Sequence, residues 1–325
     1  MNSQTTGTPG ASAPNSTAPN STASNPTASL PTARYVAGAL FGLASVTIWA
    51  GWMSITRLGV TSALGVYDVT MLRYATAGLV LLPVLLRHGL GLGKAKPWQL
   101  LVMIAGAGAP YAVVAGFGLR TTPAGEAGVL IPGVMPLFVA LISAVALRER
   151  FSIQRKVGYA LILASVALIA GVGAVATGLG SGIGHLLCMA GAFMWACYAV
   201  ALRRSGLGAL HAVAVVSVGS AVFYLPLYGL LHGFTVLDAP LRDVIFQAVY
   251  QGVFATVISL FLFARSVALL GASAGAAFGA CVPVMAALMA IPILGEYPSG
   301  TDWLGIFAAT IGVYLASGGP LPRRA

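Results

Sequence analysis

The feature that most constrains this chain is an internal duplication that needs no gap. Residues 122–171 hold two long apolar runs joined by a short polar corner, and residues 269–318 repeat that pattern 147 positions later. At this offset the identical pairs include Gly128 and Gly275, Pro136 and Pro283, Leu147 and Leu294, Glu149 and Glu296, Ser152 and Ser299, Gly158 and Gly305, and Gly171 and Gly318. Apolar composition would align Ala and Leu by chance, but not a proline, a corner glutamate and three glycines. A repeat of this kind sets the architecture of the whole chain.

The composition is that of an integral membrane protein. The chain is 58% hydrophobic and 7% charged, and its mean hydropathy is +0.92. Soluble domains carry about 25% charged residues, so this chain could not cover a surface that faces water. A net charge of +10 would suggest nucleic acid as the partner of a soluble protein. Here the basic residues are expected in loops, and we expect the lipid bilayer, not nucleic acid, as the partner.

The apolar runs predict an all-α fold with ten transmembrane helices. A bilayer core about 30 Å thick needs about 20 apolar residues of helix. The ten runs lie at residues 35–56, 68–87, 98–119, 123–147, 156–173, 182–202, 209–231, 243–264, 271–294 and 301–318. The duplicated unit therefore contains five spans, an odd number, and the second copy must cross the bilayer in the opposite sense. We expect two inverted five-helix repeats, an arrangement typical of secondary transporters.

The distribution of Lys and Arg predicts the orientation. With the N-terminus inside, 13 of the 17 basic residues fall in inner loops and tails, and 3 fall outside. Arg73 lies within the second span. Basic residues concentrate on the cytoplasmic side of membrane proteins, so both termini are expected in the cytoplasm and the protein in the cell membrane as a multi-pass chain.

Four segments follow from this reading. Residues 1–33 repeat Asn, Ser, Thr, Ala and Pro, cannot bury a core, and predict a disordered cytoplasmic tail without the features of a signal peptide. Residues 34–174 form the first repeat, residues 182–318 the second, and residues 319–325 a cytoplasmic tail. The sequence does not decide the oligomeric state, and a homodimer stays open.

Four stretches form a recognisable pattern: TIWAGWMSITRLG at the end of the first span, TMLRYATAGLVLL in the second, and the corners ALRERFS and ILGEYPS. Together with ten spans in two five-helix halves, they resemble the EamA-type transporters of the drug/metabolite transporter superfamily. The resemblance covers about residues 35–318. It implies a basket of ten helices that exports a small metabolite or drug by alternating access, without naming the substrate.

Two other functions were weighed against a transporter: a channel or structural membrane protein, and a membrane-embedded enzyme. An enzyme would need paired acids, metal-binding histidines or an activated nucleophile. The four histidines are far apart in sequence and form neither HxxxH nor HExxH. The three cysteines lie inside apolar runs without ligand spacing. We therefore expect no enzyme activity, no metal and no cofactor.

Glu126, near the outer end of the fourth predicted span, is the candidate for coupling transport to ions. One interpretation is that it binds a cation or carries a coupling proton, because ionisable residues at membrane depth face a cavity or a partner. The favoured interpretation is a helix-end residue, where negative charge suits the helix dipole. Its repeat mate is Ser273, so the acid is not part of the shared scaffold. Pro123 and Glu126 also depart from the family pattern.

Aromatic residues supply candidates for the substrate-binding wall. Trp49 and Trp195 are repeat mates at an offset of 146. They suit a site for flat or cationic substrates, although an interfacial position is an equal alternative. Trp52 is expected in the interfacial belt. Tyr111 and Tyr198 are mid-span, and their hydroxyls should face protein or a cavity.

Polar residues in the spans have two readings each. Gln247 and Gln251 lie one turn apart on the eighth span and indicate either a water-filled path or bonding between helices. Arg73 could snorkel to the interface, pair with Asp68 or Glu126, or bind a substrate carboxylate, and a structural role is favoured. The substrate-binding candidates are Trp49, Tyr111, Glu126, Trp195, Tyr198, Gln247 and Gln251.

Proline and glycine predict where spans bend and pack. Pro132, Pro136, Pro283 and Pro292 should break the fourth and ninth spans. Gly271, Gly275 and Gly279, at a spacing of four, predict close helix packing. The glycine-rich stretch at residues 178–184 predicts an outer loop, and Thr122, Ser152 and Thr301 are expected as helix caps.

Overall fold

The computed structural model describes residues 32–147, 150–177 and 179–318, and within these ranges the chain is almost entirely helical. The first half contains α1 (Thr32–Val60), α2 (Val66–His88), α3 (Pro97–Ala107), α4 (Ala109–Thr121), α5 (Ala124–Gly128), the π-helical turn η1 (Val129–Gly133), α6 (Met135–Leu147) and α7 (Ile153–Thr177). The second half contains α8 (Leu179–Ser205), α9 (Ala209–His232), the 3-10 turn η2 (Thr235–Asp238), α10 (Leu241–Gln247), the π-helical η3 (Ala248–Ile258), α11 (Ser259–Leu270), α12 (Ala272–Ala280), α13 (Val282–Leu294) and α14 (Gly300–Ala316). The two expected tails fall outside the described residues, except for residues 32 and 33. The corner residue Glu149 also falls outside them.

The predicted all-α class is confirmed, and every predicted span falls on helical segments. Eight helical segments of the described chain are long and apolar enough to cross a bilayer. Two further apolar helices, Val282–Leu294 and Gly300–Ala316, are shorter. The first of these is short because α12 and α13 meet at Cys281, where the backbone leaves the regular helix (φ −76°, ψ −12°). The number of ten spans in two inverted repeats therefore stays a prediction.

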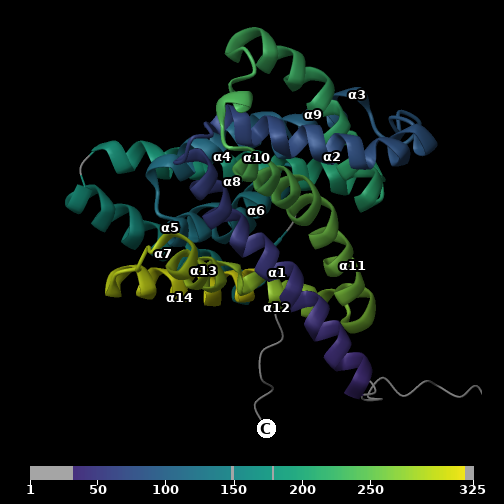
Figure 1. Cartoon of the computed structure of the whole chain (residues 1–325). Helices are drawn as coiled ribbons and strands as arrows, with labels where there is room; N and C mark the ends of the chain where they lie inside the picture. The colour runs from purple at the N-terminus through teal and green to yellow at the C-terminus, as the bar shows by residue number, and fades with distance from the viewer. Residues whose placement is uncertain (1–31, 148–149, 178, 319–325) are drawn as a thin grey trace, which may run out of the picture.

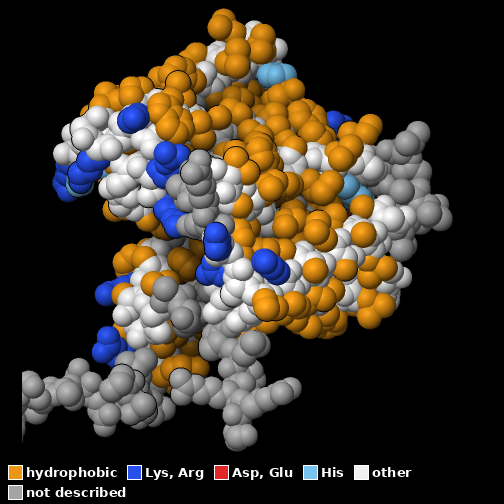
Figure 2. All heavy atoms as spheres, turned by 180° about the vertical axis from the view of Figure 1, so that it is seen from behind, with side chains coloured by type: hydrophobic (Ala, Val, Ile, Leu, Met, Phe, Trp, Pro, Cys, Tyr) orange, Lys and Arg blue, Asp and Glu red, His pale blue; other side chains and the backbone are white. Residues whose placement is uncertain are grey.

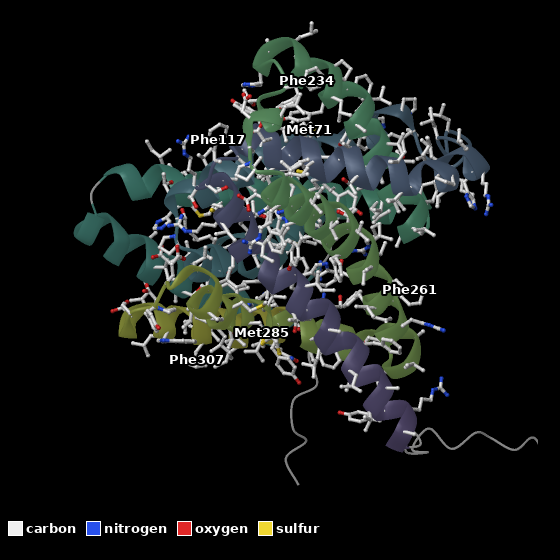
Figure 3. The ribbon with its side chains drawn as sticks, in the orientation of Figure 1. Met71, Phe117, Phe234, Phe261, Met285 and Phe307 are labelled. Carbon is white, nitrogen blue, oxygen red and sulfur yellow. The ribbon has the colours of Figure 1, made fainter. Side chains whose placement is uncertain are left out.

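The outer surface of the bundle is apolar. Leu79, Val145 and Leu230 are 74–84% exposed. Figure 2 shows hydrophobic side chains over most of one face, with Lys and Arg gathered mainly in its left half. In Figure 3, Phe261 on α11 and Phe307 on α14 lie at the outside of the bundle, and more than half of each side chain is exposed. Such a surface is stable when lipid covers it.

Two of the long helical segments are interrupted where the sequence removes hydrogen bonds or side chains. The segment at 97–121 breaks at Gly108, and Ala109 N–H donates instead to Ser220 Oγ at 3.1 Å. The segment at 124–147 passes through the π-helical turn that contains Pro132. The expected breaks of the fourth and ninth spans are confirmed near Pro132 and Pro283, whereas Pro292 lies inside α13 without interrupting it. The break at Gly108 was not predicted, although Pro110 follows it in the first turn of α4.

Helix packing follows the five-span repeat. The third span (α3 and α4) packs on α8, and the eighth span (η3 and α11) packs on α1. These contacts are equivalent, since α1 and α8 begin the two halves. α2 packs along α9, and α7 packs along α14. The helices α7 and α14 lie side by side in Figure 1. Each of these pairs joins the same span of the two halves.

At the contact between α7 and α14, the contacting residues of one helix are the repeat mates of those of the other. A Cβ atom added at Gly158 would lie 2.5 Å from Ala316 N and 2.7 Å from Gly312 O. A Cβ atom at Gly305 would meet Ile169 and the backbone of Ser165. At the offset of 147 residues, Gly158 corresponds to Gly305, Ser165 to Gly312 and Ile169 to Ala316. Two helices that approach this closely need glycine at both positions.

Some local predictions were wrong. Ser299, not Thr301, caps α14: it accepts from Asp302 N, and Asp302 in turn accepts from Ser299 N. Thr122 makes no cap, and its buried hydroxyl has no hydrogen-bond partner among the described residues. The expected outer loop is helical from Leu179 onward, because glycine within a long apolar segment does not end a helix that lipid favours.

Candidate functional site

A cavity of about 380 Å³ lies at the centre of the bundle. Its wall comes from both halves of the chain and is mostly apolar. The lining residues are Trp49, Trp52, Met53, Arg73, Tyr111, Ile131, Pro132, Met135, Pro136, Trp195, Ala255, Phe263, Gly275, Gly279, Val282, Val313 and Ser317. Ligand pockets for small molecules have about this size and character.

Hydrogen bonds to the eighth span hold two of the indole rings in this wall. Trp49 Nε1 donates to Ser259 Oγ at 3.0 Å, and Trp52 Nε1 donates to Gln251 Oε1 at 2.8 Å. Both partners are buried. The N–H groups are thereby satisfied within the protein, so the rings can present their faces to the cavity at little cost.

Tyr111 joins the tryptophans into a continuous aromatic surface. Its ring is stacked with Trp52 at a centroid distance of 6.1 Å and meets Trp195 edge-on at 5.1 Å. Trp49 contacts Phe263 at 5.0 Å. The prediction that Trp52 belongs to an interfacial belt was wrong: it is 5% exposed and lines the cavity. Its acceptor lies 199 residues away, so no local pattern could reveal it.

Arg73 is the charged residue among those that line the cavity. Its guanidinium carbon lies 5.4 Å from the centroid of the Trp52 ring and 5.5 Å from that of Tyr74. The side chain is buried, and its Nε has no hydrogen-bond partner among the described residues. The expected alternative partner Asp68 is engaged elsewhere: it accepts from Gly65 N, Thr235 Oγ1 and Tyr228.

The two glutamines bond between helices and do not line the cavity. Gln247 Nε2 donates to Ile55 O at 2.8 Å, and Gln251 Nε2 donates to Thr56 Oγ1 at 3.0 Å. Both acceptors belong to α1. Of the two alternatives for these residues, bonding between helices is the one found. Gln251 is still important for the site because it fixes the ring of Trp52.

Glu126 lies away from the central cavity, in a second cavity of about 260 Å³. Its Oε2 lies 2.6 Å from Nε2 of His185, which is 2% exposed. This second cavity is also lined by Arg57, Glu296 and Asp302. The sequence did not predict His185 as a partner, because 59 residues separate the two.

One end of the bundle, which we call the Glu296 end, is held together by a salt bridge between Arg57 and Glu296. Arg57 Nη1 also donates to Leu119 O at 2.6 Å, and Ala124 N donates to Glu296 Oε2 at 2.8 Å. These bonds join α1, α4, α5 and α13. The central cavity reaches toward the opposite end, where Ser317 follows α14 and Gly275 lies in the first turn of α12.

The structure thus brings some of the seven candidate residues together and separates the rest. Trp49, Tyr111 and Trp195 line the central cavity. Glu126, Tyr198, Gln247 and Gln251 do not. Tyr198 packs behind the wall, with its ring 5.4 Å from that of Trp195.

The glycine stripe is a packing motif at one position and not at another. A Cβ atom at Gly275 would lie 2.8 Å from Val267 Cγ2 of α11, as the predicted close packing requires. A Cβ atom at Gly279 would meet no other atom within 4 Å, so this glycine leaves space in the cavity that it lines. Within the described residues, no three His, Cys, Asp or Glu side chains are grouped so that they could hold a metal ion.

Comparison with known proteins agrees with this architecture. A protein of Streptantibioticus cattleyicolor named "Probable terminal-alkyne amino-acid exporter" is 27% identical over 284 residues, which is 86% of this chain and 93% of that protein. A solved structure described only as "Crystal structure of protein" has the same fold, with a TM-score of 0.60 and 22% identity over 86% of this chain and 96% of that one. The profile of the EamA-like transporter family matches twice, at residues 36–171 and 182–318. The chain is therefore a multi-pass membrane protein that belongs to the EamA-like transporter family.

Proposed function

We propose that this chain is a secondary transporter that exports a small metabolite or drug across the cell membrane by alternating access. The observation that carries the proposal is the central cavity, which is built from both halves of the chain. Salt-bridged helices separate it from the Glu296 end, and its wall continues toward the opposite end. A site between two repeats that opens to one side at a time is the arrangement that secondary transporters use.

The proposed orientation is compatible with export. With 13 basic residues inside and 3 outside, the Glu296 end faces the exterior and the cavity approaches the cytoplasm. A substrate would then enter from the cytoplasm onto the aromatic wall. The name of the relative in Streptantibioticus cattleyicolor makes amino acids the first metabolites to test.

Glu126 and His185 are the proposed coupling pair. A carboxylate and an imidazole in contact can exchange a proton or hold a cation, and intramembrane ionisable groups of this kind commonly form relays. The pair lies at the Glu296 end, between the proposed exterior and the central cavity. Binding of the substrate itself is assigned to the central cavity.

Export is tested by profiling metabolites in the medium around intact cells. Four strains are compared, carrying the native chain, Glu126→Gln, Asp238→Asn as a matched exposed acid, or an empty vector. We expect one class of metabolite to accumulate outside with the native chain and with Asp238→Asn, and to fall at least tenfold with Glu126→Gln at equal membrane abundance. A medium that matches the empty vector would refute export, and an unchanged Glu126→Gln strain would refute the coupling role.

A further inference from the structure

We propose that Arg73 is the anchor for a carboxylate on the transported molecule, whose apolar body lies against the aromatic wall. The substrate class would be small amphipathic organic acids, including amino acids with apolar side chains. This inference rests on the proposed transport function and deepens it. It starts from an unsatisfied positive charge in the wall of a mostly apolar cavity.

The charge of Arg73 has no compensating acid in the described part of the chain. The salt bridges found there are Arg57–Glu296 and His185–Glu126. Neither includes Arg73, and none of the residues that line the central cavity is Asp or Glu. Asp68, five positions before Arg73, already accepts three hydrogen bonds.

The side chain is also largely shielded from bulk water. Arg73 is 8% exposed, and its Nε is shielded and unbonded. Ring contacts with Trp52 and Tyr74 stabilise the cation partly. They leave the guanidinium N–H donors without the planar, bidentate acceptor that arginine favours. A buried charge in a membrane protein normally has a partner or marks a substrate path, and here the cavity is the place where a partner can enter.

The remaining wall defines the rest of the molecule. Tyr111, Trp195, Trp49 and Phe263 offer ring surfaces, and Gly279 leaves room beside them. A volume of about 380 Å³ accommodates one small molecule with a flat or branched apolar group. A permanent cation without a carboxylate would be repelled by Arg73, which argues against the cationic substrates that the tryptophans alone would allow.

The test is a binding assay on the purified full-length chain in lipid nanodiscs. Three of the five tryptophans line the cavity, so their fluorescence reports on occupancy. The probes are 3-phenylpropionate and L-phenylalanine, the amide of each, and phenethylamine. We expect each acid that binds to bind roughly ten- to a hundredfold more tightly than its amide, because a buried charge-assisted hydrogen bond is lost in the amide. Comparison of the two acids shows whether an ammonium group contributes.

Variants separate a binding role from a structural one. Arg73→Gln should remove the preference for the acid while the amide binds as before, and Arg73→Lys should restore part of it. Arg265→Gln is the matched control, because Arg265 also lies over a ring, that of Phe261, but is exposed and does not line the cavity. If Arg73→Gln fails to fold, the comparison of acids with their amides on the native chain still tests whether the cavity prefers a carboxylate.

Equal binding of acids and amides, tighter binding of phenethylamine, or a preference that survives Arg73→Gln would overturn the proposal. Its failure is distinct from failure of the transport function. Arg73-dependent binding by a chain that exports nothing would support the role of Arg73 and refute the transport function. Export without any preference for carboxylates would support the transport function and refute the role of Arg73.

Discussion

Replacing Glu296 with alanine should unlock the Glu296 end of the bundle. The substitution removes two interactions of one carboxylate, the salt bridge to Arg57 and the hydrogen bond from Ala124 N. Hydrogen bonds to charged groups contribute about 1.5–3 kcal/mol each. The side chains of Arg57 and Glu296 are 19% and 24% exposed, which favours the lower value. We therefore expect the free energy that favours the closed state of this end to fall by about 3 kcal/mol.

The assay is the labelling rate of Cys188 by a membrane-impermeant maleimide added outside intact cells. Cys188 has no exposed surface and lies one turn after His185, against Gly118 of α4. Cys197 and Cys281 are first replaced by alanine. When opening is faster than labelling, the rate follows the population of the open state. Since about 1.4 kcal/mol corresponds to a tenfold change, Cys188 should be labelled about 100-fold faster in Glu296→Ala than in the native chain. In Glu296→Gln, which keeps an acceptor, Cys188 should be labelled about tenfold faster.

Asp238→Asn is the control, because it removes an equal charge from an exposed residue. Its labelling rate should match that of the native chain. A rate for Glu296→Ala within twofold of the native rate would refute the idea that these bonds hold the end closed. Faster labelling from inside-out vesicles only would instead refute the proposed orientation.

Two further substitutions test the packing and the support of the site. Gly158→Ala should destabilise the chain by about 1–3 kcal/mol in a detergent unfolding titration, because the added Cβ meets backbone atoms of α14. Gly171→Ala, on the same helix with no atom within 4 Å of the added Cβ, should not, and equal effects would contradict the glycine contact. Gln251→Leu should cost about 1–3 kcal/mol by leaving Trp52 Nε1 without its acceptor, and unchanged stability with unchanged Trp fluorescence would show that this bond does not hold the ring.

The helices could be predicted from the sequence, because in a bilayer the requirement for a long apolar run is strict. The runs at residues 68–87 and 209–231 became α2 and α9, with ends that differ by at most two residues. The π-helical η3 could not be predicted. It depends on a shift of backbone hydrogen bonds within a continuous apolar segment, which leaves no mark on hydropathy.

The site was less predictable, because apolar composition does not say which side of a helix faces lipid and which faces a cavity. Trp49, Tyr111 and Trp195 were named from their chemistry and do line the cavity. Trp52 was assigned to the interface, and that assignment was wrong. The position of Arg73 in the cavity wall could not be predicted either, for the same reason: the contacts that place both residues come from helices distant in the chain. Only the packed bundle reveals them.

The duplication supplies a symmetric scaffold, and the site depends on where the two copies differ. Gly128 is packed, since a Cβ atom there would lie 2.6 Å from the Cβ of Ala286. Its repeat mate Gly275 is also packed, with an added Cβ 2.8 Å from Val267 Cγ2, but it borders the cavity as Gly128 does not. The same sequence position therefore borders the cavity in one half of the chain and lies outside it in the other. If the halves exchanged these arrangements, the cavity would close where it is now open and open where the salt bridge now holds it, as the proposed alternating access requires.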